Sequence, residues 1–173
     1  NGAVFSHMTV MYANALYRRG FANEGWKALR TLAKTALDFD TSRIYPGIPE
    51  YFRSDGRGMY HYLTGAASWF MMTMITQAFG VRGEAGNLLL APKLTAEQFD
   101  EQGRASLSLV FAGKKLEIVY ENEGMKEYGD YTVDSASCSG AELQIKDGCC
   151  AVISRSMLET LSDECHRVNV KLI

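Results

Sequence analysis

The hydrophobic pattern of this chain changes its period at Gly80, and this change constrains the fold more than any other feature. Before Gly80 the apolar residues recur at the spacing of amphipathic helices, whereas after it they alternate with polar residues as in strands. A run of helices followed by a run of strands is typical of the α+β class or of two separate domains. We therefore expect a helical domain at residues 1–82 and a β domain at residues 83–173.

The first part of the chain predicts three helices. The apolar face of the first, at residues 4–19, is expected to consist of Val4, Met8, Met11, Tyr12, Ala15 and Leu16. Residues 21–37 form the second helix, which pairs antiparallel with the first through Gly20. A third helix within residues 59–80 is apolar nearly all round, so we expect it to be buried on several sides. Because three helices cannot bury it well alone, we expect it to pack against further helices outside this chain. The irregular segment 38–58 is long enough to suggest a functional loop.

The second part of the chain predicts an antiparallel β-sandwich or jelly-roll-like domain. Alternating residues on either side of Ala112-Gly113-Lys114 indicate a β-hairpin, and Asp147-Gly148 is a second hairpin turn signal. Further strands are expected near residues 131–133 and 167–173, with a short helix at residues 154–161.

The composition excludes several classes of protein. A chain with 47% hydrophobic residues and a net charge of -2 is too apolar and too neutral to be disordered. It also lacks the basic excess of a nucleic-acid-binding protein. The most apolar run, residues 66–79, is shorter than the roughly 20 residues of a membrane span. Because the four cysteines include no Cys-x-x-Cys pair, we expect no metal site. We also expect these cysteines to be the reduced thiols of a cytoplasmic protein.

Two segments carry candidate ligand-binding residues. Thr64 and Gly65 stand where the third helix would begin, and the unpaired N–H groups of a helix N-terminus favour an anion or a sugar hydroxyl. In the irregular segment Glu50 precedes Tyr51, and a carboxylate beside an aromatic ring is common in sugar sites. His7 lies in the first turn of the first helix. A structural role is the alternative for each of these residues, and no pair of carboxylates suited to glycoside hydrolysis is evident.

Two longer motifs resemble a known family. The segment Asn-Gly-Ala-Val-Phe-Ser-His at residues 1–7 resembles the Asn-Gly-x-x-Phe-x-His segment of glycoside hydrolase family 94, which contains cellobiose phosphorylases and cyclic β-1,2-glucan synthases. Tyr-Leu-Thr-Gly-Ala-Ala-Ser-Trp at residues 62–69 resembles its Trp-x-Thr-Gly-x-Ala-x-Trp segment. Residues 79–82 and 88–94 resemble the exit from its helical barrel, so the resemblance extends from residue 1 to about residue 120.

The resemblance implies an architecture and a reaction. Family members join an N-terminal β-sandwich, an (α/α)6 barrel and a C-terminal jelly-roll-like sheet, so this chain would supply the last barrel helices and the sheet domain of a longer protein. The reaction would be inverting phosphorolysis of a β-glucoside, in which an acid protonates the leaving oxygen while phosphate attacks the anomeric carbon from the opposite face. The catalytic aspartate would lie upstream of Asn1, so the isolated chain should be inactive.

The resemblance also assigns residues and partners. His7, Thr64 and Gly65 resemble the phosphate-binding His and Thr-Gly of the family. Glu50 and Tyr51 resemble its Glu-Pro-Tyr segment near the sugar, although the order here is Pro-Glu-Tyr. The implied partners are an oligosaccharide or disaccharide and inorganic phosphate as co-substrate, with no cofactor, metal, nucleic acid or membrane. The full-length protein would be cytoplasmic and could form a homodimer.

Two alternatives remain open from the sequence. An (α/α)6-barrel glycoside hydrolase or a glucan-synthase relative would keep the helices but use the phosphate residues for another purpose. A non-catalytic carbohydrate-binding module would use the sheet as its binding surface.

Overall fold

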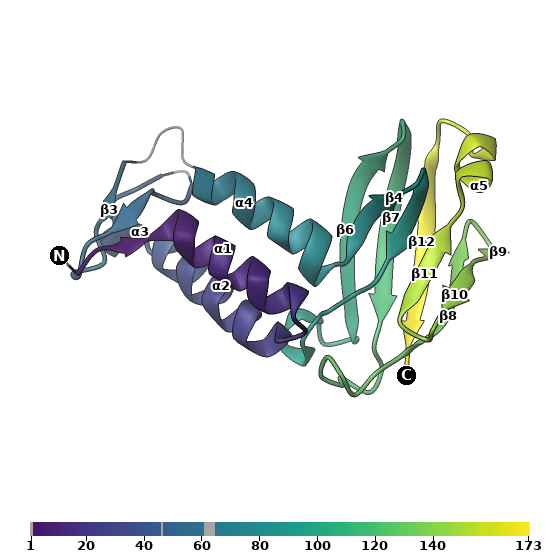
Figure 1. Cartoon of the computed structure of the whole chain (residues 1–173), viewed down its shortest axis with the longest axis horizontal. Coiled ribbons are helices and arrows are strands. Elements are labelled where there is room, and N and C mark those ends of the chain that lie inside the picture. The colour runs from purple at the N-terminus through teal and green to yellow at the C-terminus, as the bar shows by residue number, and fades with distance from the viewer. Residues whose placement is uncertain (1, 46, 61–64) are drawn as a thin grey trace. The chain divides into compact units, whose positions relative to one another are not determined.

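The computed structural model describes residues 2–45, 47–60 and 65–173 of the chain. These residues form a mixed α+β protein with two compact units, Asn1–Ala78 and Phe79–Ile173 (Figure 1). The predicted α+β class is therefore confirmed, and within the described residues the helices do not close into a barrel. None of the described helices combines the length and the apolar character that crossing a bilayer requires.

The first unit is built on an antiparallel pair of helices, α1 (Ser6–Arg18) and α2 (Ala22–Leu37). Gly20 turns the chain between them at a φ of 87°, a left-handed conformation that glycine adopts without a steric penalty. A short helix, α3 (Phe39–Ser42), follows, and its N-cap Asp38 accepts a hydrogen bond from the Thr41 amide. The predicted helix pair and its turn are thus confirmed.

The buried face of α1 is not the one predicted. The helix buries Val10, Ala13, Asn14 and Tyr17, whereas most of the predicted face is exposed. Small residues determine which face of α1 packs against α2, because a Cβ atom on Gly25 of α2 would lie only 2.6 Å from the ring of Tyr17. The two backbones therefore approach each other on the alanine and glycine side, and the side that carries the methionines faces outward.

The third helix lies within the segment in which it was predicted. It comprises α4 (Gly65–Thr73) and a π-helical turn, η1 (Met74–Ala78). Met71 and Met72 are 58% and 40% exposed, so this unit buries the helix only in part. Its contact with α1 includes a buried hydrogen bond in which the Asn14 amide donates to the Thr73 hydroxyl at 3.0 Å.

The predicted irregular segment contributes to a small antiparallel sheet. This sheet has the order β1-β2-β3 and consists of β1 (Val4–Phe5), β2 (Tyr51–Phe52) and β3 (Gly58–Met59). Because β1 runs directly into α1, the sheet fixes one end of the helix pair against residues 50–60.

The second unit holds two larger sheets (Figure 1). The antiparallel four-stranded sheet has the order β10-β11-β5-β4 and consists of β4 (Val81–Glu84), β5 (Asn87–Leu90), β10 (Gln144–Lys146) and β11 (Cys150–Ile153). The five-stranded sheet has the order β6-β7-β12-β8-β9 and consists of β6 (Arg104–Phe111), β7 (Lys114–Glu121), β8 (Val133–Cys138), β9 (Ala141–Glu142) and β12 (Cys165–Leu172). Two short helices complete the unit, namely η2 (Ala96–Gln98) and α5 (Arg155–Thr160).

The five-stranded sheet is mixed, which corrects the prediction of a purely antiparallel domain. Strand β12 pairs parallel with β7 on one side and antiparallel with β8 on the other. The chain reaches β12 only after it has formed β8 to β11 and α5, and a connection of that length can return a strand in either direction. The predicted hairpin between β6 and β7 is confirmed, with positive φ values of 49° at Ala112 and 78° at Gly113.

Candidate functional site

Backbone hydrogen bonds hold Glu50 beside the first residues of α1. The Ser6 amide donates to the Glu50 carbonyl at 2.8 Å, and the Glu50 amide donates to the Tyr60 carbonyl at 3.0 Å. In the small sheet Phe5 lies opposite Tyr51. The first turn of α1, which carries His7, is thereby placed next to the Glu50-Tyr51 segment.

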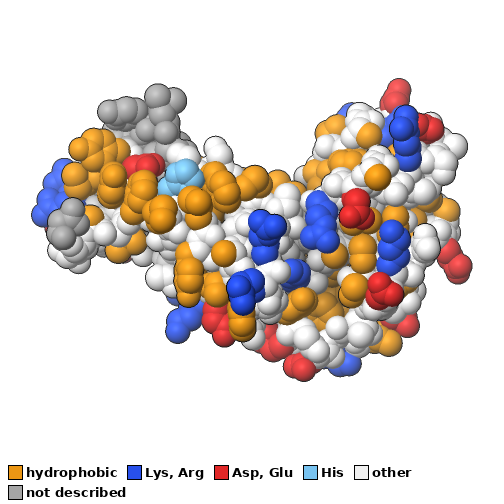
Figure 2. Space-filling model, viewed as in Figure 1, with side chains coloured by type: hydrophobic (Ala, Val, Ile, Leu, Met, Phe, Trp, Pro, Cys, Tyr) orange, Lys and Arg blue, Asp and Glu red, His pale blue; other side chains and the backbone are white. Residues whose placement is uncertain are grey.

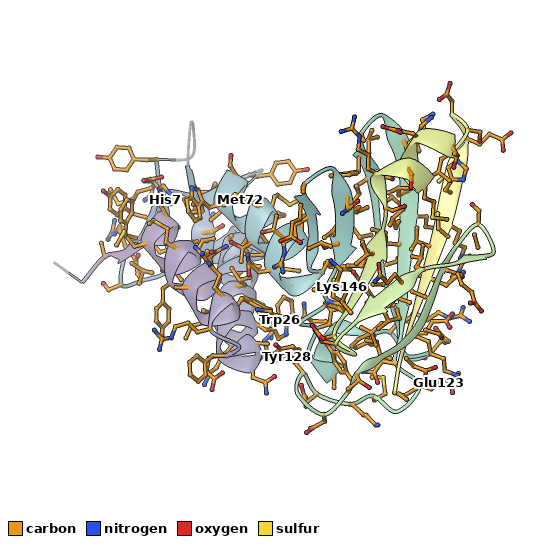
Figure 3. The ribbon with its side chains drawn as sticks, turned by 45° about the vertical axis from the view of Figure 1, so that its right-hand side comes forward. His7, Trp26, Met72, Glu123, Tyr128 and Lys146 are labelled. Carbon is orange, nitrogen blue, oxygen red and sulfur yellow. The ribbon has the colours of Figure 1, made fainter. Side chains whose placement is uncertain are left out.

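His7 also lies against the first residue of α4. A Cβ atom on Gly65 would be 2.8 Å from Cε1 and 2.9 Å from Nδ1 of the His7 ring. Real Cβ contacts are almost never that short, so only glycine allows the imidazole to come this close to the helix backbone. Figure 3 shows His7 near the end of the unit at which α4 begins, with Met72 further along that helix.

A chain of ring contacts connects these residues. Tyr60 meets Tyr51 edge to face at a centroid distance of 5.8 Å, and Tyr51 stacks on Phe5 at 4.8 Å with an interplanar angle of 16°. Phe5 then contacts His7 at 6.3 Å, and His7 contacts Trp69 of α4 at 5.7 Å. Aromatic pairs at these distances and angles are favourable, so the rings stabilise one continuous cluster from Tyr60, just after β3, through β2, β1 and α1 to α4.

Two polar atoms of this cluster are buried without a hydrogen-bond partner among the described residues, namely Nε2 of His7 and the hydroxyl oxygen of Ser6. Buried polar atoms are usually paired, so an unpaired imidazole nitrogen at a helix start is notable. The first backbone N–H groups of a helix also lack intrahelical partners and attract anions. His7 and the start of α4 together can therefore offer several donors to one anion.

The structure brings together four of the five residues that the sequence singled out. His7, Gly65, Glu50 and Tyr51 share one end of the first unit through the contacts above. Thr64, the fifth, lies outside the described residues. Glu50 and Tyr51 are both half-buried, as expected for side chains that line a site without closing it.

Sequence reasoning missed Tyr60, because it considered residues 59–62 only as the segment just before the third helix. Tyr60 is 55% exposed and has a φ of 58°, an uncommon conformation for a bulky side chain. Together with Ala3, Tyr51 and Met59 it lines an open cavity of about 420 Å³. Such strained residues cluster at ligand sites, and the nearest sequence signal was the aromatic run around His61.

The same unit exposes an unusual number of large apolar side chains. Figure 2 shows hydrophobic groups spread along the face of this unit that carries α1 and α4. They include Val4, Met8, Met11, Tyr12, Met71 and Met72.

Comparison with known proteins gives two weak similarities, both to phosphorylases. The chain is 24% identical over 106 residues to 3-O-beta-D-glucopyranosyl-beta-D-glucuronide phosphorylase from Paenibacillus borealis, a match that covers 56% of this chain and 14% of that protein. It is 29% identical over 108 residues to cellobionic acid phosphorylase from Neurospora crassa, with 54% of this chain and 13% of that protein covered. The chain thus spans only a small part of the curated relatives it matches. No protein-family model matches the chain.

Proposed function

We propose that this chain is part of a glycoside phosphorylase that cleaves a β-linked glucoside with inorganic phosphate and inverts the anomeric centre. The observation that carries the proposal is the packing of His7 against Gly65. These residues are far apart in sequence, and both resemble phosphate-binding residues of glycoside hydrolase family 94. The similarity to two phosphorylases supports the same function.

On the phosphate side, we assign the imidazole of His7, the hydroxyl of Thr64 and the backbone N–H groups that start at Gly65. Nε2 of His7 is buried without a partner among the described residues, so it is available to a ligand oxygen. Donors from α1 and from the start of α4 would then surround the phosphate from two directions. Hydrogen bonds to a charged oxygen are about twice as strong as neutral ones, which favours phosphate over water at this point.

On the sugar side, we assign Glu50 and Tyr51. Tyr51 is held between Phe5 and Tyr60 by ring contacts, which fixes the orientation of its own ring. A fixed ring can pack against the apolar face of a pyranose, and the neighbouring carboxylate can accept hydrogen bonds from sugar hydroxyl groups. The contacts between the residues assigned to the two ligands support a reaction between sugar and phosphate at this place.

In the proposed reaction, a phosphate oxygen forms a bond to the anomeric carbon while the bond from that carbon to the leaving oxygen breaks. A carboxylic acid outside this chain donates a proton to the leaving oxygen, and the products are an α-glycosyl phosphate and a free sugar. Phosphate takes the place that a base-activated water has in an inverting hydrolase. The residues of this chain bind and orient phosphate and supply no proton.

The architecture proposed with this function follows the family. Residues 1–82 would be the last helices of an (α/α)6 barrel, and residues 83–173 a jelly-roll-like C-terminal domain. We propose a cytoplasmic location, which the four unpaired cysteines support. For the full-length protein we propose a homodimer.

Both relatives are named for substrates with an acidic sugar, a glucuronide in one case and cellobionic acid in the other. We therefore propose a disaccharide that carries a carboxylate as the first substrate to test, with cellobiose as its neutral counterpart.

The experiment is a phosphate titration of the full-length protein at saturating disaccharide. His7→Ala should raise the KM for phosphate by about tenfold or more, since it removes a direct donor to a charged oxygen. The matched control is His166→Ala, because His166 is a half-buried histidine that bonds to Ser139 and Ser162 in the other unit. An unchanged KM for phosphate in His7→Ala would exclude this residue from the phosphate site.

A further inference from the structure

The second unit contains a small cavity of about 190 Å³ that the proposed reaction does not use. The side chains that line it with polar groups are those of Arg82, Lys93, Tyr128, Tyr131, Thr132 and Cys149. Sites for drug-sized ligands usually have volumes of roughly 300–1,000 Å³, so this cavity is better suited to an ion than to a disaccharide. Figure 3 shows Tyr128 on the loop that connects β7 to β8.

The cavity concentrates positive charge. Arg82 comes from β4 and Lys93 from the segment after β5, and no acidic residue is among the described residues that line it. Burial lowers the pKa of Lys93, and the nearby charge of Arg82 lowers it further. A third cation, Lys146, lies close enough to act with Arg82 on the thiol of Cys150. An anion in this cavity would be attracted by both the Arg82 and the Lys93 charge.

The backbone on both sides of Lys93 is hydrogen-bonded to the Tyr131 hydroxyl. The Tyr131 hydroxyl accepts a hydrogen bond from the Leu94 amide at 2.9 Å and lies 3.0 Å from the Leu94 carbonyl and 3.3 Å from the Pro92 carbonyl. The segment that carries Lys93 is therefore tied on both sides to one buried side chain. A backbone fixed in this way loses little conformational freedom when a ligand binds.

An apolar base lies beneath the charged groups. Leu89, Cys150 and Val152 form a buried cluster against which Ala91 packs, and Arg82 lies opposite Leu89 in the strand register. At the rim Gly148 has a φ of 62° in the turn before Cys149. A low-dielectric base strengthens the attraction between the cations and an anion at this position.

We propose that this cavity binds a small oxyanion, either inorganic phosphate or the phosphate group of a sugar phosphate. The planar guanidinium of Arg82 matches two phosphate oxygens at once, and Lys93 adds a second charge. The Thr132 and Tyr128 hydroxyls complete the lining. This site is separate from the phosphate position assigned to His7 and does not depend on it.

Cys149 provides a direct readout, because it is exposed and lines the cavity. Cys165 is also exposed but does not line it, so it serves as the reference within the same molecule. Alkylation of both cysteines by iodoacetamide is followed by mass spectrometry in phosphate and in chloride of equal ionic strength. About 10 mM phosphate should slow alkylation of Cys149 about threefold relative to Cys165, which corresponds to a dissociation constant of about 5 mM.

Three variants separate this site from its alternatives. Arg82→Gln should abolish the protection of Cys149, whereas Lys171→Gln, an exposed lysine of β12 that does not line the cavity, should keep it. His7→Ala should also keep it, so failure of the proposed phosphate site elsewhere would not affect this result. A parallel titration with α-glucose 1-phosphate shows which of the two sources binds more tightly.

Two results would overturn the proposal. One is equal alkylation of Cys149 in phosphate and chloride, and the other is protection that survives Arg82→Gln. A titration of the amide resonances of Gly148 and Cys149 by heteronuclear NMR gives the second measurement. It should yield the same dissociation constant and should show no saturable shift in Arg82→Gln.

Discussion

At the scale of single residues, a glycine and a histidine meet at the start of α4. The absent side chain of Gly65 makes room for the imidazole of His7. The ring is held from its other sides by Phe5 and Trp69. Gly65, a position that admits no Cβ atom, therefore determines the orientation of the His7 imidazole that we propose binds phosphate.

Gly65→Ala should destabilise the protein by about 1–3 kcal/mol, since the new methyl group overlaps the His7 ring. Urea denaturation measures the change. In a His7→Ala background the same substitution should be neutral or slightly stabilising, because alanine is the better helix former. Gly124→Ala is the control, since only the flexible side chain of Lys126 lies near that position. An equal cost of Gly65→Ala in both backgrounds would argue against the contact.

Sequence reasoning identified these residues from local signals and then from motifs. A helix start drew attention to Gly65 and a carboxylate beside a ring to Glu50 and Tyr51, and the motif at residues 1–7 singled out His7. The contact between them depends on the path of the chain through β1 and β2, which no local pattern specifies. Tyr60 was missed because its left-handed φ of 58° is set by tertiary packing and not by intrinsic preference.

At the scale of elements, α1 and α4 must keep their relative position for His7 to meet Gly65. The buried hydrogen bond from Asn14 to Thr73 holds the two helices together near the other end of α4. A paired polar group inside an apolar contact permits one register, because any slip leaves a buried donor unsatisfied.

Thr73→Val should cost about 1–3 kcal/mol of unfolding free energy, because the Asn14 amide loses its acceptor while it stays buried. The double variant Asn14→Leu/Thr73→Val should lose less than the sum of its two single variants, which a thermodynamic cycle from urea denaturation measures. The control is Thr76→Val, since the Thr76 hydroxyl donates only to the Met72 carbonyl of its own helix. If the two valine variants were equally stable, the hydrogen bond would have no such role.

The elements themselves were predicted more reliably than their faces. The helix pair, the Gly20 turn and the hairpin at Ala112-Gly113 follow from local signals and are confirmed. The buried face of α1 and the parallel pairing of β12 were predicted wrongly. Because α1 carries apolar residues on more than one side, its sequence does not reveal which side will be packed. The direction of β12 depends on the long connection that precedes it.

At the scale of the whole molecule, buried groups that must stay protonated link stability to pH. Burial raises the pKa of the phenols of Tyr17 and Tyr120 and of the thiols of Cys138 and Cys150. Their contribution is fully present below the ordinary values of 9.0 for a thiol and 10.0 for a phenol. It is lost as the pH rises above those values, since the unfolded chain releases these protons first.

The unfolding free energy should therefore fall on the alkaline side of about pH 9, and the Tyr120 phenol alone can contribute up to about 1.4 kcal/mol per pH unit. Urea midpoints across this range measure the slope. Tyr120→Phe should flatten it, although the variant also loses the hydrogen bond from the Tyr120 hydroxyl to the Phe79 carbonyl. Tyr12→Phe, at an exposed tyrosine, should leave the slope unchanged. The same slope in Tyr120→Phe would contradict the assignment.

The central claim is that this chain belongs to an enzyme that uses phosphate to cleave a β-glucoside. The most direct measurement is phosphorus NMR of the full-length protein with phosphate and a carboxylated β-linked disaccharide. The proposed function predicts that α-glucose 1-phosphate accumulates, that no cleavage occurs without phosphate, and that His7→Ala slows the reaction. Release of free glucose in phosphate-free buffer, with no sugar phosphate formed when phosphate is added, would contradict it.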